Sequence, residues 1–345
     1  MKNKKFNLLL SVILTIFISG CSLADSENTG SSNQTSNSTL SSTQNLENNS
    51  QSNSENSVDK NTNTQNEIAV SNNENTISAN SQDETKNNSK NVFVYFLNTG
   101  NSDSILIDDN GTFMLIDGGD NDDENLVVNF LKKHNVTKLK YLIATHNHAD
   151  HLGGLDAVVK NIPVETTFVS NGSASSKTYR DFINALASKD LTPAVPLENN
   201  KFYLNNSYFE VFNTNGGNST NNESLVLLYT NGNDKMLFTG DAEAETENEI
   251  LNKLPQNIDL LKVGHHGSRT STTSQFLNKL NPKYAVILCG KDNSYHHPHK
   301  ETMDKLKAKG IEVHRSDECG DIVFESTGNG LKSDCEVIGD YAIGK

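Results

Sequence analysis

The chain has 345 residues, of which 34% are hydrophobic, and its formal net charge at pH 7 is −14. This acidic balance argues against broad electrostatic affinity for nucleic acid, because the phosphate backbone attracts basic surfaces. Apolar residues are distributed unevenly along the chain, and their distribution divides it into three parts.

The first part is typical of a bacterial secretion signal. MKNKK is basic, FNLLLSVILTIFISG is an apolar run too short for a comfortable membrane span, and small residues precede Cys21. The four residues ISGC resemble the lipobox of bacterial lipoproteins. This resemblance implies that residues 1–20 are a removed signal peptide and that a lipid on Cys21 anchors the protein to the outside of the cell membrane. The alternative is an ordinary secretory signal with an incidental cysteine.

The second part, residues 21–90, is rich in Asn and Ser and contains no aromatic residue and no proline. It has too few apolar side chains to offset the entropy of ordering, so we predict that it is disordered. A flexible tether of this length reaches on the order of 40 to 50 Å, which would hold the third part clear of a membrane. The rival interpretation, an adhesive prion-like tract, lacks the aromatic residues that would support it.

The third part, residues 91–345, is predicted to fold as a single α/β domain. Short apolar runs typical of strands recur along it, among them NVFVYFLN, FMLIDGG, YLIATH, SLVLLY and YAVILCG. Apolar residues at helical spacing predict a helix with one face in the core; they are Leu126, Val127, Phe130 and Leu131. We find neither an internal repeat nor a second linker, and the length suffices for a sizeable core.

Three cysteines lie in this domain. Cys289 is in an apolar run and is predicted to be a buried thiol. Cys319 and Cys335 flank a predicted hairpin near the C-terminus. In an oxidising environment the two can form a disulfide, but sequence alone does not give their separation, so the bonded and free forms both stay open.

The stretch THNHADHLGG gathers four potential metal ligands within six positions, 146–151. It follows the predicted strand YLIAT and precedes a helix, so the ligands lie on a strand-to-helix loop. Alternation along an extended backbone directs His146 and His148 to one side, whereas Asp150 and His151 project from the turn that follows. Imidazole and carboxylate groups suit zinc or manganese. The spacing therefore predicts two adjacent sets of metal ligands.

This HxHxDH pattern, with FMLIDGG before it and LFTGD after it, resembles the metallo-β-lactamase superfamily. Further blocks occur in the order found in the hydrolase domain of ComEC-type DNA-uptake proteins, namely FLNTGNSDSILID, NNESLVL, DLLKVGHHGS and NSYHHPHK. The resemblance covers almost all of residues 91–343 and implies an αββα sandwich. The first block departs from the usual DVGxGDS at Asn98, Thr99 and Ser102, which leaves the fold assignment intact.

The resemblance implies two divalent metal ions, with zinc as the first expectation and manganese as the alternative. No histidine lies between His151 and His265, so the third histidine that many relatives use at the first metal is absent. The expected ligands of the first ion are His146, His148 and Asp241. Those of the second ion are Asp150, His151, Asp241 and His265. A carboxylate such as Asp241 can bridge two ions because each oxygen can bind one of them.

Further residues are expected to act beside the ions. If HHGS is extended, only one of its histidines readily faces the same ion, so we expect His265 to be the ligand and His266 to contact the substrate. By resemblance, His297 in YHHPH matches a recurrent histidine that would serve the leaving oxygen; the alternative is a surface loop whose histidines cap a helix near Glu301. The catalytic candidates are Asp150, His266 and His297. The supporting or substrate-contacting candidates are Asp117, Asn222, Ser268 and His299.

These features predict an extracytoplasmic metal-dependent hydrolase that cleaves a phosphodiester such as DNA. The same blocks also resemble choline-phosphate esterases of the superfamily, so a phosphorylcholine-type phosphoesterase of the cell surface is an alternative. The missing third histidine and the HHGS block point away from β-lactamases. A surface binding protein on a degenerate hydrolase scaffold is the non-enzymatic alternative, and the intact ligand pattern speaks against it.

Overall fold

The computed structural model describes residues 91–336 and 341–344. The expectations for the signal peptide at residues 1–20, for the lipid anchor on Cys21 and for the tether at residues 21–90 fall on residues outside this part. Within the described part, no helix combines the length and the apolar character that crossing a membrane requires.

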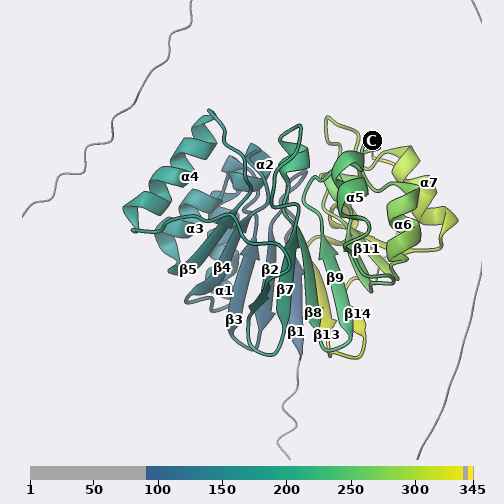
Figure 1. The fold of residues 1–345 in the computed structure, drawn as a ribbon, viewed down its shortest axis with the longest axis horizontal. Helices are drawn as coiled ribbons and strands as arrows, with labels where there is room; N and C mark the ends of the chain where they lie inside the picture. The colour runs from purple at the N-terminus through teal and green to yellow at the C-terminus, as the bar shows by residue number, and fades with distance from the viewer. Residues whose placement is uncertain (1–90, 337–340, 345) are drawn as a thin grey trace, which may run out of the picture. The chain divides into compact units, whose positions relative to one another are not determined.

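Two seven-stranded sheets form the centre of the domain, and helices cover their outer faces (Figure 1). The first sheet has the order β14-β13-β1-β2-β3-β4-β5. Its strands are β1 (Val92–Phe96), β2 (Ile105–Asp109), β3 (Thr112–Ile116), β4 (Leu139–Ala144), β5 (Val164–Val169), β13 (Ile322–Ser326) and β14 (Leu331–Ser333). The second sheet has the order β12-β11-β10-β9-β8-β7-β6. Its strands are β6 (Lys201–Tyr203), β7 (Tyr208–Phe212), β8 (Val226–Asn231), β9 (Asp234–Phe238), β10 (Leu260–Lys262), β11 (Tyr284–Ile287) and β12 (Glu312–Arg315).

The helices divide between the two outer faces. Those on the first sheet are α1 (Glu124–Lys133), α3 (Leu155–Asn161) and α4 (Lys177–Ser188), and those on the second are α5 (Ala244–Ile250), α6 (Ser274–Leu280) and α7 (Lys300–Ala308). Shorter helical turns lie in the loops: η1 (Asn121–Asp123), α2 (Ala149–Leu152), η2 (Asn221–Glu223), η3 (Gly264–Gly267) and α8 (Ser316–Cys319). This arrangement is the predicted αββα sandwich, and the fold class is confirmed.

Strand alternation separates the buried residues into layers. In β2, Ile105 and Ile107 pack between the two sheets, whereas Leu106 packs beneath the helices. In β9, Phe238 enters the layer between the sheets and Leu237 enters the layer under α5, α6 and α7. Because successive side chains of a strand point to opposite faces, each sheet is apolar on both sides and requires a cover on both.

Helix α1 differs in one residue from its predicted core-facing stripe. Val127 and Leu131 are buried as expected, but Leu126 is 41% exposed and Val128 is buried in its place. The helix begins at Glu124, and at 100° per residue the buried face is centred on Val127, Val128 and Leu131. The predicted helix is confirmed, but its buried face lies about one residue further along the chain than predicted.

Both sheets change from antiparallel to parallel pairing in the same way. Strands β3, β4 and β5 are parallel in the first sheet, and strands β9, β10, β11 and β12 are parallel in the second. Parallel strands end at one edge of their sheet, and ligands bind in the loops beyond these carboxyl ends. The loops that follow β3, β4, β9, β10 and β11 carry the histidines and aspartates that the sequence singled out.

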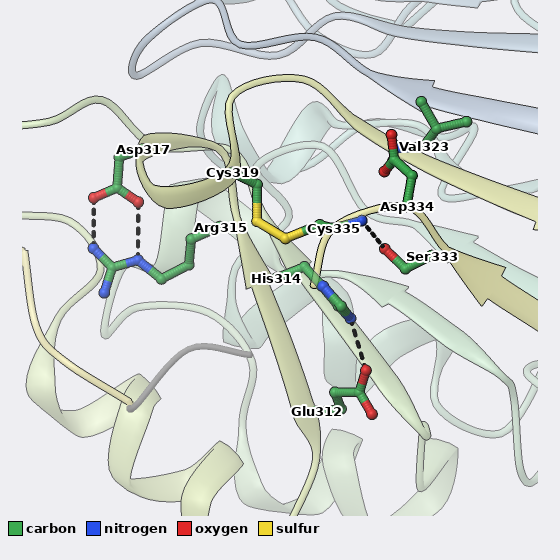
Figure 2. The surroundings of a disulfide bond; sticks show 9 residues. All are labelled: Glu312, His314, Arg315, Asp317, Cys319, Val323, Ser333, Asp334 and Cys335. Carbon is green, nitrogen blue, oxygen red and sulfur yellow. Dashed lines mark hydrogen bonds and ion pairs between the residues drawn. A yellow bond between two sulfur atoms is a disulfide. The ribbon is translucent and has the colours of Figure 1, made fainter. Parts of the chain in front are cut away.

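The cysteines near the C-terminus are joined. Cys319, at the end of α8, and Cys335, just after β14, form a disulfide with their Cα atoms 5.9 Å apart (Figure 2). Cys289 is a buried free thiol, as predicted. Burial raises the pKa of its thiol to about 12, so this side chain is inert near neutral pH.

Candidate metal centre

The HxHxDH loop lies where β4 ends and α2 begins. His146 follows the strand and is fully buried, whereas His148 stands at the N-terminus of α2 and is exposed. Nε2 of His146 is 3.1 Å from Nδ1 of His148, so the two rings converge. Asp150 and His151 lie in the first turn of α2, on a different part of the backbone. The loop therefore presents two groups of side chains, as its spacing predicts.

Asp117, which follows β3, fixes the orientation of His151. Its carboxylate accepts hydrogen bonds from the backbone N–H of Thr145 at 2.8 Å and from the Thr145 hydroxyl at 2.7 Å. It is also 2.8 Å from Nδ1 of His151. A carboxylate that holds one ring nitrogen sets the orientation of the ring and directs the other nitrogen to the site. Burial opposes protonation of His151, but Asp241 and Asp117 outweigh it and hold the pKa of His151 well above its usual range, so a metal ion would bind Nε2 by displacing a proton.

Asp150, His151, Asp241 and His266 form one compact cluster. Their ligand atoms all lie within 4.8 Å of one another. Nε2 of His266 is 3.3 Å from a carboxylate oxygen of Asp150, and Nε2 of His151 is 3.3 Å from Asp241. Among the described residues, three buried atoms of this cluster lack a hydrogen-bond partner: Nε2 of His151, Oδ1 of Asp241 and Nε2 of His266. Buried polar atoms are normally paired, so this donor set fits a divalent cation.

Asp241, in the loop after β9, belongs to both groups of ligands. Its Oδ1 faces His151, and its Oδ2 is 3.9 Å from Nε2 of His146. The hydroxyl of Ser224 accepts from the backbone N–H of Asp241 at 3.1 Å and contacts Nδ1 of His146 at 3.2 Å. Burial opposes ionisation of Asp241, but His151 and His266 outweigh it and hold the pKa of Asp241 well below its usual range. The carboxylate is thus charged and placed between the two groups.

The backbone of the HHGS segment is not extended. His265 and His266 have φ angles of +50° and +52°, in the left-handed region, within η3. Both rings therefore turn toward Asp241, with Nε2 at 3.7 Å for His265 and 3.6 Å for His266. The argument that only one of these rings readily faces the same ion holds for an extended segment, and this segment is not extended.

Only His266 joins the cluster with Asp150 and His151. The side chain of His265 is 24% exposed, and its Nδ1 lies 3.4 Å from Glu243 and 3.2 Å from the Thr270 hydroxyl. The structure thus brings His266 together with Asp150, His151 and Asp241, where the sequence analysis expected His265, and it leaves His265 at the edge of the site.

A buried ion pair between Asp103 and Lys262 lies beside Nδ1 of His266. Nδ1 of His266 is 3.0 Å from the carbonyl oxygen of Leu288 and 3.4 Å from Asp103. Asp103 is in turn 2.8 Å from Nζ of Lys262, whose side chain is fully buried. Burial opposes ionisation of Asp103, but Lys262 and His266 outweigh it and lower its pKa to about 2. The sequence analysis missed Lys262, although a lone lysine in the apolar run DLLKVG was a visible signal.

The cluster opens on a cleft of about 270 Å³. His148, Asp150, Asp241 and His266 line it, together with His265, Tyr295 and His297. The sequence analysis did not single out Tyr295 or Asn221, which also lines the cleft. Tyr295 is 64% exposed, and its ring stacks on that of His297 at 5.6 Å between centroids.

The YHHPH loop brings His297 to the cleft. Asn293 holds its backbone, because the Asn293 amide accepts from the N–H of His297 at 3.0 Å and donates to its carbonyl at 2.7 Å. Among the described residues, Nδ1 of His297 has no hydrogen-bond partner. Burial, aided by the charge of His266, lowers the pKa of His297 to about 3. The ring is therefore neutral near pH 7 and can donate a hydrogen bond.

Three of the supporting candidates lie away from the cleft lining. The side-chain oxygen of Asn222 accepts from the backbone N–H of Glu243 at 3.1 Å, so it holds the loop after β9. The hydroxyl of Ser268 contacts that of Thr270 at 3.0 Å. His299 precedes α7, and its Nδ1 accepts from the backbone N–H of Arg269 at 3.1 Å. Asn222 and His299 thus contact neighbouring loops, and Ser268 contacts its own loop.

Comparison with known proteins places this site in a family. The model of the metallo-beta-lactamase superfamily matches residues 97–291. The chain is 33% identical over 204 residues to ComE operon protein 3 of Bacillus subtilis, covering 58% of this chain and 26% of that protein. It is 29% identical over 217 residues to Recombination protein 2 of Haemophilus influenzae, covering 61% and 26%. The match thus spans about a quarter of the length of either relative.

Among solved structures, the metallo-beta-lactamase fold protein YhfI of Bacillus subtilis matches 68% of this chain and 99% of its own, at 12% identity and a TM-score of 0.48. The family model covers more than half of the chain and includes the HxHxDH loop, Asp241 and the HHGS histidines. The chain therefore belongs to the metallo-β-lactamase superfamily and is related there to ComE operon protein 3 and Recombination protein 2.

Proposed function

We propose that this protein is an extracytoplasmic phosphodiesterase that cleaves nucleic acid with two divalent ions, zinc in the first instance. One observation carries the proposal. Two groups of potential metal ligands share Asp241 and lie at a cleft. The neutral ring of His297 also lines this cleft and can donate a hydrogen bond there. Related proteins support nucleic acid as the substrate class, since one of them is named Recombination protein 2.

The residues of the chain divide into two tasks. His146, His148 and Asp241 would hold one ion, and Asp150, His151, Asp241 and His266 would hold the other. When bound, such a pair supplies Lewis acidity and activates water near neutral pH. This assignment gives the second ion to His266 in place of His265, because only His266 lies within the cluster.

The remaining groups act on the substrate. A phosphodiester carries negative charge, which increases on the leaving oxygen as the bond breaks. His297 and His265 line the cleft beside the ligands, and their N–H groups would donate to the phosphoryl and leaving oxygens. Asn293 holds the His297 backbone on both sides, so the donor is positioned before the substrate arrives.

A panel of substrates tests the proposal. The purified protein is assayed with zinc, manganese or magnesium on linear DNA, RNA, a bis-aryl phosphodiester, phosphorylcholine esters and a cephalosporin. We expect turnover of the nucleic acids and loss of it in chelator. We also expect His297→Ala to keep the metal content while it lowers the turnover of DNA by roughly two powers of ten or more, with less harm to a nitrophenolate ester, whose leaving group needs less help.

Other outcomes of the panel would reject the proposal. Cephalosporin turnover without any phosphoester cleavage would make the protein an amide hydrolase. Metal binding without turnover of any substrate would favour the surface binding protein. Loss of metal in His297→Ala would make this residue a ligand and would require a new assignment of His266.

Tyr295 favours a second candidate, a phosphoesterase that acts on phosphorylcholine groups of the cell surface. Its ring lies at the cleft with 64% of its surface exposed. The face of a tyrosine ring attracts quaternary ammonium groups such as choline. Under this alternative, phosphorylcholine esters are turned over faster than DNA, and Tyr295→Ala slows the choline ester most.

The proposed location is the outer face of the cell membrane, through a lipid on Cys21. The motivation is the apolar segment that ends in ISGC. Fractionation of cells checks this location: Cys21→Ser should move the protein from the membrane fraction to the medium. Unchanged membrane association of that variant would exclude the lipid anchor.

A further inference from the structure

A second potential metal site lies around His314, apart from the catalytic cluster. His314 is on β12, and its side chain is fully buried beside the rings of Tyr284 and Phe324, whose centroids lie 6.1 and 5.2 Å from its own. Its Nε2 is 3.0 Å from a carboxylate oxygen of Glu312 on the same strand. None of these residues belongs to the ligand sets of the catalytic cleft.

The other nitrogen of His314 faces the disulfide. Figure 2 shows the Cys319–Cys335 bond beside the ring, on the side away from Glu312. The ligand atoms of His314, Cys319 and Cys335 lie within 4.8 Å of one another. Within the described residues, Nδ1 of His314 is buried and has no hydrogen-bond partner. An unpaired polar atom in a fully buried side chain requires an explanation.

The surroundings of His314 prepare this nitrogen to bind a metal. Burial, which outweighs the attraction of Glu312, lowers the pKa of His314, so the ring is neutral near pH 7. With its Nε2–H donated to Glu312, the ring keeps the lone pair on Nδ1. A histidine whose far nitrogen donates to a carboxylate is the usual arrangement of metal-binding histidines.

We propose that reduction of the disulfide converts His314, Cys319 and Cys335 into a binding site for one zinc ion. A thiol reductant supplies two electrons and two protons and is itself oxidised to a disulfide, while the S–S bond of the protein breaks into two thiols. Binding of Zn²⁺ then releases both protons, so that two thiolates and the neutral imidazole hold the ion. Two thiolates and one imidazole form a donor set that selects zinc over magnesium and calcium.

The geometry requires only local movement. Ligand atoms of one tetrahedral zinc ion lie roughly 3.6–3.8 Å apart, given Zn–S and Zn–N bonds of about 2.3 and 2.0–2.1 Å. The three atoms already lie within 4.8 Å. Both cysteines are partly exposed, so a reductant and an ion can reach them. In either state α8 stays linked to the segment after β14, by sulfur when oxidised and by metal when reduced.

Cobalt spectroscopy tests the proposal independently of any activity. The full chain, carrying Cys21→Ser to remove that thiol, is freed of metal, and half of it is reduced with a phosphine. Co²⁺ is then titrated into both halves. We expect a thiolate-to-cobalt charge-transfer band only in the reduced protein, with Zn²⁺ abolishing it, because the catalytic cluster contains no cysteine. Cys289→Ser is the matched control and should leave the band unchanged.

Two variants examine the ligands. Cys335→Ser should lose the band, and His314→Gln should weaken cobalt binding at this site by at least about tenfold. If Cys335→Ser does not fold, alkylation of the reduced thiols in the parent protein replaces it and should abolish the band. The proposal is overturned if the reduced chain, with two additional titratable thiols, binds cobalt without a sulfur band, or if His314→Gln binds it as tightly as the parent. Either result leaves the phosphodiesterase proposal untouched.

Discussion

The two halves of the sandwich supply the residues of the candidate site in different ways. In the N-terminal half, His146, His148, Asp150 and His151 follow one strand, β4, within six positions. In the C-terminal half, Asp241, His266 and His297 come from three loops, after β9, β10 and β11. The first contribution is local in sequence, whereas the second depends on parallel strands that end at one edge.

The N-terminal half presents its side chains from regular backbone. In the C-terminal half, two of the histidines lie on backbone with unusual φ angles. His148 and His151 belong to the start of a helix. His265 and His266 both have positive φ, which non-glycine residues rarely adopt. Strained backbone of this kind persists where the surrounding structure holds it, and here Lys262 and Asp103 pack beneath it. The geometry of the C-terminal half is therefore expected to be more sensitive to single substitutions than that of the N-terminal half.

The largest effect is expected where the two halves meet, at Asp241. Because its carboxylate lies beside both groups of potential ligands, Asp241→Ala should weaken the binding of both ions and lower activity by at least about a hundredfold. Metal analysis after gel filtration and steady-state rates measure the two effects. The exposed Asp190→Asn is the control, and loss of only one ion in Asp241→Ala would contradict the bridging role.

A smaller effect separates the two histidines of HHGS. His266→Ala should reduce the affinity for one ion by roughly ten- to a hundredfold, because Nε2 of His266 lies in the cluster with Asp150. His265→Ala should keep both ions and lower only the turnover. Equilibrium titration with Zn²⁺ distinguishes them. The reverse result, with metal lost from His265→Ala, would restore the ligand set expected from the sequence.

The smallest effect on metal affinity is expected at Asp103, which contacts Nδ1 of His266 in the C-terminal half. Asp103→Asn should weaken binding of one ion by about tenfold, since the carbonyl of Leu288 still orients His266. It also leaves Lys262 buried and unpaired, which should destabilise the fold by about 3–5 kcal/mol in urea unfolding. Adding Lys262→Met should recover stability but not metal affinity. Recovery of both by the double variant would show that Asp103 acts on folding alone.

The sequence predicts those parts of the molecule that depend on local pattern. The αββα fold, the strands and the convergence of His146 with His148 follow from alternation and resemblance. The backbone reversal at His265 and His266 could not be predicted, because contacts with Leu288 and Asp103, which are distant in sequence, stabilise it. For the same reason Lys262 was overlooked, since its role depends on Asp103, a partner in the loop between β1 and β2. The exposure of Leu126 shows that helix orientation also depends on where the helix begins.

The three consecutive left-handed residues His265, His266 and Gly267, with φ from +50° to +86°, also limit how this protein can evolve. Asn and Gly tolerate such backbone, whereas Val and Ile do not. Replacement of His266 by Asn would therefore keep the loop while removing an imidazole, and replacement by Val would distort it. Relatives that lack these histidines but keep this loop are expected to carry Asn or Gly at the same positions.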